Sequence, residues 1–292
     1  MNHIRKANPM NKIFVIPNPN KDTDFIVTKK VISLLSSNGA TVFMAQKYEY
    51  SNIIFCHYRE PEYVDFDLVI VIGGDGSFID ASVYAIKKNV PILGINLGKV
   101  GYLSEVEPSS LETLLKIFNG EYNIEEKILL TTRVIGAELD FASERLAVND
   151  VVVSHDNHIG VSDFVVYSKE GGIRYRADGV IFSTPAGSTA YSLSAGGPIV
   201  SHKAEAIIVT PIAPHSFFNR SIVFGGNEEI KIKNTGNSIL NISVDGREFS
   251  RIAPGEKCSV CASERRLKVL TFKENNMFSN LFSKMQILED II

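Results

Sequence analysis

A single carboxylate, Asp75, stands among Gly73, Gly74 and Gly76, directly after the apolar run Leu68 to Ile72. The run is rich in β-branched residues and predicts a buried strand, and the amphipathic residues that follow predict a helix. Glycines let the backbone come close to a bulky ligand, and the N–H groups at a helix start favour phosphate. A carboxylate at such a place repels phosphate unless it binds a metal or accepts a proton. The pattern therefore favours phosphoryl-transfer chemistry over a structural turn.

The polar pair Asn149-Asp150 precedes three valines that predict a strand. Its side chains suit hydrogen bonding to ribose hydroxyls or adenine, although a plain turn before a strand fits the same residues. His215, at the end of a Pro-Ile-Ala-Pro run, has a ligand-binding interpretation and a structural one. Taken alone, the structural interpretation is the better one for each of these motifs.

A hydroxyl-rich stretch runs from Ser183 to Ser194, and Arg176 and Asp178 stand just before the strand that leads into it. Its many small residues permit close approach and hydrogen bonding to a polar ligand. Tyr191 is suited to stacking on a ring. A solvated surface loop is the alternative, which the length and the glycines of the stretch make less attractive.

The chain shows no strong metal-binding pattern. Cys258 and Cys261 have C-x-x-C spacing, but a zinc site needs more ligands and no second pair exists. Their surroundings alternate as in a strand, which would point the two thiols to opposite faces. His155 and His158 lie in a turn-like context. We predict no metal site formed by the protein alone.

The elements that must position these residues fall into two parts. Strand and helix signals alternate up to about residue 125 and predict a doubly wound α/β domain over residues 1–125. Helical stripes are expected after Asp22, after Gly76 and over Leu111 to Phe118, whereas residues 46–66 are expected to form a loop or flap. Many short β-type runs then predict an all-β domain over residues 126–271. The tail, residues 272–292, has helical periodicity and is expected to pack back on the first domain.

The bulk composition excludes several classes of protein. The chain has 292 residues and a net charge of −3 without a block of like charge, so nucleic-acid binding has no electrostatic basis. No apolar run approaches the ~18 residues of a transmembrane helix, and no basic amphipathic stretch indicates a membrane surface. The N-terminus lacks a signal-peptide core, and three cysteines fit a reducing compartment. The composition therefore predicts a cytoplasmic protein.

Together the motifs resemble the NAD kinase family in order and spacing. The Gly73–Gly76 turn alone is shared with lipid kinases and phosphofructokinases, whereas the long stretch before Pro198 is highly specific. The resemblance covers residues 12 to 290 and rests on the segments Gly73–Gly76, Asn96–Leu103, Asn149-Asp150, Asp178–Pro198, Pro211–His215 and Val244–Gly246.

The resemblance implies an ATP:NAD 2′-phosphotransferase that makes NADP and forms homotetramers or homodimers whose sites are completed across a subunit contact. Mg²⁺ is expected with the ATP. Asp75 would contact the ribose hydroxyls of the adenosine part of NAD and accept the proton, and Gly73, Gly74 and Gly76 would cradle phosphates. The other NAD-binding residues that the resemblance implies are Asn149, Asp150, Arg176, Asp178, Thr189, Ala190, Tyr191, Ser192, Leu193, Ser194 and Arg247.

The chain departs from the family pattern at three positions. Ser77 stands where Thr or Asn is common in the family, and its hydroxyl would take the place of their polar groups. Ala186 replaces the usual Thr or Ser, which removes a hydrogen bond to adenine. Arg247 replaces a frequent neutral polar residue, and we hypothesise that it favours a phosphate. Two other functions remain open from the sequence: a lipid kinase that shares the glycine-rich turn, and a non-catalytic NADP-binding sensor.

Overall fold

The computed structural model describes residues 10–51, 53–98, 105–135, 144–156 and 160–272. The chain divides into two compact units, one formed by residues 1–126 with 267–292 and the other by residues 127–266. Each unit has its own core of buried apolar side chains. Among the described helices, none is both long and apolar enough to cross a membrane.

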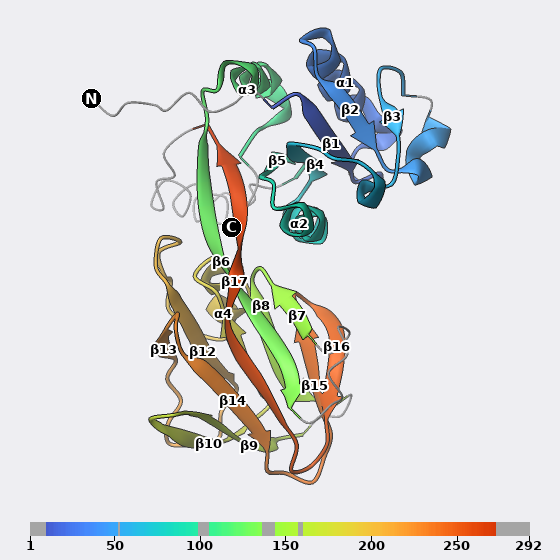
Figure 1. Cartoon of the computed structure of the whole chain (residues 1–292). Helices are drawn as coiled ribbons and strands as arrows, with labels where there is room; N and C mark the ends of the chain where they lie inside the picture. The colour runs from blue at the N-terminus through green and yellow to red at the C-terminus, as the bar shows by residue number, and fades with distance from the viewer. Residues whose placement is uncertain (1–9, 52, 99–104, 136–143, 157–159, 273–292) are drawn as a thin grey trace, which may run out of the picture. The chain divides into compact units, whose positions relative to one another are not determined.

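The first unit is built on a parallel sheet (Figure 1). Its strands, in the order β3-β2-β1-β4-β5, are β1 (Lys12–Pro17), β2 (Thr41–Met44), β3 (His57–Tyr58), β4 (Leu68–Gly73) and β5 (Ile92–Asn96). The end of β17 (Lys257–Thr271) pairs with β5. The helices are α1 (Ile26–Ser37), α2 (Asp75–Lys88) and α3 (Lys116–Asn119), with 3₁₀ turns at Thr23–Phe25, Gln46–Ser51, Pro61–Tyr63 and Pro108–Leu115. The predicted α/β fold is confirmed.

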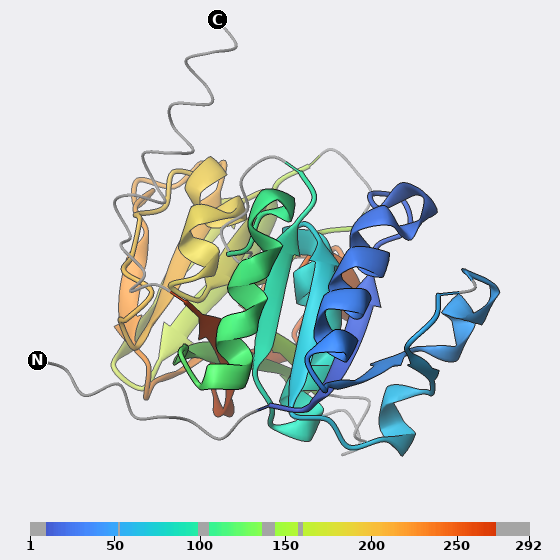
Figure 2. The same cartoon turned by 90° about the horizontal axis from the view of Figure 1, so that it is seen from above.

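Helices cover both faces of this sheet. Ile13, Val15 and Ile70 share one core with α1 and the segment that leads into α3. Figure 2 shows α1 in blue and that segment in green side by side over the sheet. Phe14 and Val69 alternate with these residues along their strands, so they point to the other face of the sheet, where they are equally buried. Helix α2 packs on β4 and β5. Burial on both faces explains why the strands read as continuous apolar runs.

Two segments of the first unit differ from the prediction. The stripe expected over Leu111 to Phe118 buries Leu111, Leu114 and Ile117, while Leu115 and Phe118 are only partly buried. The segment begins as a 3₁₀ helix, in which residues three apart align, so the buried stripe has a period of three. Residues 46–66 contain two 3₁₀ turns and the two-residue strand β3, which is too short to show a periodic pattern.

The second unit is all-β, as predicted, and consists of two sheets that share one core. One sheet is antiparallel with the order β13-β12-β11-β8-β15-β16, and the other contains the order β10-β9-β14-β17, with β6 beside β17 and β7. The bounds are β6 (Asn123–Ile135), β7 (Glu144–Ala147), β8 (Asp150–His155), β9 (Ser162–Ser168), β10 (Gly171–Ala177), β11 (Gly179–Ser183), β12 (Ala206–Ile212), β13 (Ile222–Gly225), β14 (Glu229–Asn234), β15 (Leu240–Val244) and β16 (Arg247–Ile252).

The hydroxyl-rich stretch that ends at Ser194 contains a 3₁₀ turn, Gly187–Thr189, and the one-turn helix α4 (Tyr191–Ser194). The predicted helix of the tail lies outside the described residues, as does the part of the Asn96–Leu103 motif from Lys99 on.

Candidate active site

Gly74 is the single residue between strand β4 and helix α2. The strand ends at Gly73, which pairs with Asn96 at the end of β5, and the helix begins at Asp75. Asp75 and Gly76 therefore belong to the first helical turn and not to a longer loop. A helix N-terminus carries partial positive charge and free N–H groups, so it favours both a carboxylate and a phosphate.

The three glycines of this turn differ in what limits their size. A Cβ at Gly73 would lie 2.6 Å from Oγ and 2.7 Å from Cβ of Ser77, so packing excludes a larger residue. A Cβ at Gly74 would lie 2.5 Å from Nζ of Lys21, the flexible end of a long side chain. A Cβ at Gly76 would have no neighbour within 4 Å among the described residues. Packing therefore requires glycine at 73, whereas position 76 borders open space.

The loop after β1 brings Lys21 to this turn. The side-chain amide of Asn18 donates a hydrogen bond of 2.7 Å to Oγ of Ser77, and the carbonyl of Asn18 accepts the N–H of Lys21 at 3.0 Å. The Lys21 ammonium lies beside Gly74 and Gly98, which follow β4 and β5. Within the described part of the chain, no residue forms an ion pair with it. An exposed positive charge thus stands next to the predicted phosphate-binding turn.

In the second unit, Asp245 holds the corner formed by Asn149 and Asp150. Its Oδ2 accepts the N–H of Val148 at 2.8 Å, and its Oδ1 accepts those of Asn149 at 2.8 Å and Asp150 at 3.1 Å. The N–H of Asp245 in turn donates to the carbonyl of Asp150 at 3.0 Å. One carboxylate therefore fixes three consecutive backbone groups.

Thr184 holds the same corner from β11. Its Oγ1 donates to the carbonyl of Val148 at 2.7 Å and accepts the N–H of Gly187 at 2.9 Å. Its own N–H donates to the carbonyl of Asn149 at 2.9 Å. A Cβ at Gly187 would lie 2.1 Å from that carbonyl oxygen, so the turn after Thr184 packs directly on the corner.

Asp150 carries an unusual carboxyl group. It is 5 % exposed, and burial together with the nearby Asp245 carboxylate raises its pKa to about 7. Ser183 is opposite Asp150 in the pairing of β8 with β11. The Ser183 hydroxyl is fully buried and finds no hydrogen-bond partner among the described residues. The corner therefore combines a carboxyl that titrates near neutrality with a hydroxyl whose hydrogen bonding is unsatisfied.

The predicted residues of the hydroxyl-rich stretch divide by exposure. Ser192 is fully buried, and its Oγ lies 3.0 Å from Oγ1 of Thr210, which is 2.9 Å from Oγ of Ser221. The Ser192 hydroxyl therefore holds α4 on β12. Of the other five, Tyr191, Leu193 and Ser194 are exposed, and Thr189 and Ala190 are half-buried.

Arg176 and Asp178 do not join the Asn149–Asp150 corner within this chain. The carbonyl of Arg176 accepts the N–H of His215 at 2.8 Å, and Asp178, half-buried, precedes β11. Asp150 lies beside the far end of that strand. A strand rises about 3.3 Å per residue, so the two groups are separated by roughly 13 Å or more along β11.

The remaining predicted positions are placed as follows. Arg247 is exposed and begins β16, directly after the turn that carries Asp245. Ala186 is buried within the turn after Thr184. Cys258 is buried and Cys261 half-buried, both as free thiols. The described residues contain no cluster of three or more His, Cys, Asp or Glu side chains able to hold a metal.

The sequence assigns no individual role to Lys21 or to the side chain of Asp245, and it includes Thr184 only as one member of the hydroxyl-rich stretch. Asp245 and Gly246 match a family motif, but an Asp-Gly pair is also an ordinary hairpin turn. The only signal for Lys21 is its place after β1, because carboxyl ends of parallel strands meet at one edge of a sheet. The contacts of all three residues depend on segments far apart in the sequence.

The fold and these groups define a nucleotide-dependent phosphotransferase. Residues 13–122 match the model of the ATP-NAD kinase N-terminal domain, and residues 148–272 match that of the ATP-NAD kinase C-terminal domain. The chain belongs to the NAD kinase family, and it is an enzyme that phosphorylates NAD with ATP.

Individual relatives agree with this assignment. An NAD kinase of Lachnoclostridium phytofermentans is 33% identical over 287 residues, which cover 94% of this chain and 99% of the relative. An NAD kinase of Legionella pneumophila (strain Paris) is 40% identical over 231 residues, 78% of each chain. An NAD kinase from Archaeoglobus fulgidus, solved in complex with ATP, has a TM-score of 0.73 and 25% identity, covering 94% of this chain and 98% of that one. A yeast NADH kinase complexed with NADH shares the fold, with a TM-score of 0.82, 24% identity and coverage of 94% and 87%.

Proposed function

We propose that the phosphoryl group is transferred to the 2′-hydroxyl of the adenosine ribose of NAD, and that Asp75 accepts the proton. The observation that carries this proposal is the position of Asp75 in the first turn of α2, beside Gly76, where a Cβ would have no described residue within 4 Å. A ribose hydroxyl is a weak nucleophile, and a positioned carboxylate takes its proton as the bond to phosphorus forms. The positive end of the helix meanwhile stabilises negative charge on the phosphoryl oxygens.

The phosphates of the donor are proposed to meet Lys21 and the backbone of Gly74 and Gly76. Phosphoryl transfer depends mainly on positioning and charge neutralisation, and lysine binds phosphate as a point charge. Mg²⁺ on the triphosphate would neutralise further charge. Mg²⁺ is held largely by substrate phosphates and water, so it needs no dedicated cage of protein ligands here.

The adenosine part of NAD is proposed to bind at the Asn149–Asp150 corner. Ionised Asp150 only accepts hydrogen bonds, which suits ribose hydroxyls. Because the pKa of Asp150 is about 7, NAD affinity is expected to rise as the pH passes upward through that value. Thr189, Ala190, Tyr191, Ser192, Leu193 and Ser194 are proposed to line the dinucleotide site, Ser192 through its backbone, with Tyr191 against a ring. Arg247 is proposed to attract a phosphate.

Arg176 and Asp178 are proposed to serve the NAD site of another copy in a homotetramer or homodimer. Their separation from Asp150 by the length of β11 supports this arrangement, since one small ligand group does not reach both ends. Symmetric homo-oligomers place the same pair of surfaces together twice, so each copy would give and receive these residues.

A cytoplasmic location is part of the proposal. Cys56, Cys258 and Cys261 are all free. Burial raises the pKa of each thiol, to about 12 for Cys258, so they are poor nucleophiles. Free thiols of this kind suit a reducing compartment.

The experiment is an incubation of the purified protein with NAD, Mg²⁺ and either ATP or inorganic polyphosphate. NADP is detected with a dehydrogenase specific for the 2′-phosphate. We expect NADP with ATP. Phosphorylation at another hydroxyl, seen as consumption of ATP and NAD without NADP, would refute the 2′ assignment. Binding of dinucleotide without turnover would indicate a sensor, and phosphorylation of a diacylglycerol in vesicles would indicate a lipid kinase.

A further inference from the structure

The hairpin turn between β15 and β16 consists of Asp245 and Gly246. Both residues have positive φ, 49° and 77°. Two-residue turns of type I′ need positive φ at both positions, which Asp-Gly and Asn-Gly pairs supply. The turn accounts for Gly246 and for a small polar residue at 245, but it does not by itself require a negative charge there.

The two oxygens of Asp245 serve a segment that is distant in sequence. They accept the N–H groups of Val148, Asn149 and Asp150 in succession. An asparagine has one acceptor oxygen where an aspartate has two, so an amide leaves one of these donors unmatched. The carboxylate is therefore fitted to the corner and not to the hairpin.

The same arrangement places two carboxyl groups close together. Burial and the charge of Asp245 raise the pKa of Asp150 to about 7. On the neighbouring strands, β11 faces Asp150 with Ser183, and neither β11 nor β15 contains an ionisable residue. Arg247, at the start of β16, is exposed. Ionisation of Asp150 therefore lowers the stability of the folded protein. Groups with strongly shifted pKa values are often found at functional sites.

We propose, on the basis of the function proposed above, that Asp245 is a positioning residue of the NAD site. It holds the backbone of Asn149 and Asp150 so that their side chains meet the adenosine part of the dinucleotide. Its negative charge also adds to the effect of burial in disfavouring the ionised form of Asp150. Asp245 acts through this corner and not through contact with NAD.

Replacement of Asp245 by Ala tests the positioning. The variant loses the acceptor for three N–H groups, and we expect KM for NAD to rise about tenfold or more, because small misplacements of binding groups are costly. The kcat and the KM for ATP should change less than about twofold. A role in folding alone would lower the active fraction, and therefore kcat, at an unchanged KM for NAD.

Replacement of Asp245 by Asn tests the charge in a variant of nearly the same shape. An amide oxygen at the Oδ1 position keeps the bonds to Asn149 and Asp150 and loses only the one to Val148. We expect the midpoint of the rise in NAD affinity with pH, measured by calorimetry, to move down by up to about one unit, since burial is the larger cause of the shift. NAD affinity above that midpoint should recover much of what Asp245→Ala loses.

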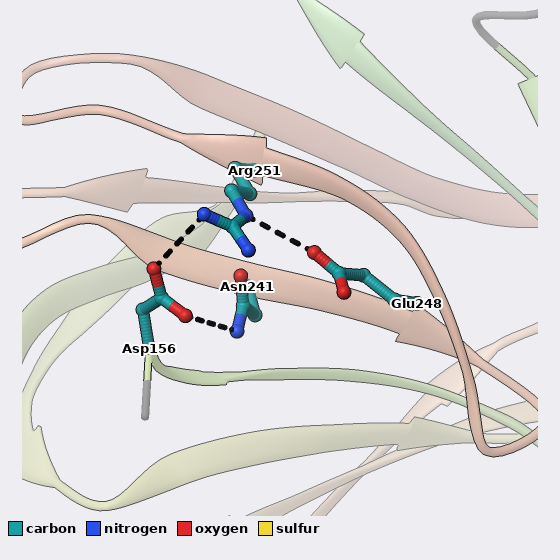
Figure 3. A network of polar contacts seen from close by, with 4 residues as sticks. All are labelled: Asp156, Asn241, Glu248 and Arg251. Carbon is teal, nitrogen blue, oxygen red and sulfur yellow. Dashed lines mark hydrogen bonds and ion pairs between the residues drawn. The ribbon is translucent and has the colours of Figure 1, made fainter. Parts of the chain in front are cut away.

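Asp156→Asn is the matched control. Asp156 follows β8 at the end opposite Asp150, and its carboxylate accepts Nδ2 of Asn241 at 2.9 Å and pairs with Arg251 at 3.1 Å (Figure 3). Arg251 also pairs with Glu248 at 3.0 Å. Loss of this charge should leave both the KM for NAD and its pH midpoint unchanged.

Two results would overturn the proposal: a KM for NAD in Asp245→Ala within about twofold of the wild type, or an unmoved pH midpoint in Asp245→Asn. If Asp245→Ala does not fold, the Asn variant alone decides. A wild-type protein that binds NAD but makes no NADP refutes the proposed function. In that case the calorimetric comparison still tests Asp245.

Discussion

The side-chain amide of Asn18 is hydrogen-bonded to the hydroxyl of Ser77 at 2.7 Å, which ties the loop after β1 to the first turn of α2. The N–H of Asn18 also donates to the carbonyl of Ile72 at 2.8 Å, near the end of β4. The loop therefore keeps a fixed position beside the glycine-rich turn. Lys21, three residues further on, is held there as a consequence.

Lys21→Ala is expected to raise the KM for ATP about ten- to a hundredfold, because the variant loses one charge-assisted hydrogen bond to phosphate. NAD affinity, measured by calorimetry without ATP, should stay within about twofold of the wild type. Lys30→Ala on the exposed side of α1 is the control and should change neither value. A weakened NAD affinity with an unchanged KM for ATP would place Lys21 on the dinucleotide instead of the donor.

Gly76→Ala separates the needs of the fold from those of the ligand. Position 76 is helical, and a Cβ there would meet no atom within 4 Å in the part of the chain that the structure describes, so alanine should keep or raise the free energy of unfolding, by up to about 1 kcal/mol. Activity should nevertheless fall, because the added methyl group occupies the space proposed for phosphate. Gly73→Ala should instead destabilise the fold by about 1–3 kcal/mol, since its Cβ would overlap Ser77. Full activity of Gly76→Ala would contradict the proposed phosphate position.

Asp150→Asn is expected to raise the free energy of unfolding at pH 8 and to change it little at pH 4. The pKa of Asp150 is about 7 in the folded protein against an ordinary value of 3.8, so only the unfolded chain ionises readily between these values. The stability that this group contributes is therefore lost as the pH rises from about 4 to about 7. Above that range the free energy of unfolding of the Asn variant should exceed that of the wild type by an amount on the order of 1–3 kcal/mol.

The same variant should bind NAD more weakly, because it lacks the carboxylate that is proposed to accept the ribose hydroxyls. A carboxyl group that lowers stability but serves binding is an example of the trade-off between stability and function. Urea unfolding at the two pH values and calorimetry with NAD measure the two effects. Asp156→Asn, which removes a carboxylate from an ion pair, should be destabilising at pH 8 and serves as the comparison. An Asp150→Asn protein less stable than the wild type at pH 8 would be inconsistent with a buried, repelled carboxyl.

Mixing two inactive variants tests the shared site. Asp150→Ala and Asp178→Ala should each lose activity. In a two-fold symmetric dimer, exchange of subunits between them restores one intact site in each mixed dimer, up to about one quarter of the wild-type activity. Activity is assayed before and after exchange, which is followed with differently labelled subunits. Complete exchange without recovery would mean that both residues serve a site within one chain.

The sequence predicts the strands of both units well because their patterns are local. The runs at β1, β4 and β5 are buried on both faces, and turn residues separate the short strands of the second unit. The 3₁₀ start before α3 was not predictable in the same way, since Leu111, Leu114 and Leu115 fit an α-helical stripe equally well. Packing against α1 selects the period of three.

The candidate site was predictable only as far as residue types reveal it. Asp75 and its glycines are recognisable from the sequence because a carboxylate in such a turn would repel phosphate unless it binds a metal or accepts a proton. The bonds from Asp245 to Asn149 and Asp150 join positions nearly a hundred residues apart, and no local pattern encodes them. The separation of Asp178 from Asp150 along β11 likewise follows from strand pairing, which the motif order does not reveal.

The most direct test of the central claim is the turnover of Asp75→Asn with NAD, ATP and Mg²⁺, compared with the wild type. The amide preserves the size of the side chain but cannot accept the proton. We expect NAD affinity to be retained and kcat to fall by about 10²–10⁴-fold, the usual contribution of a general base. An Asp75→Asn enzyme that makes NADP at the wild-type rate would contradict the assignment of Asp75 as the proton acceptor.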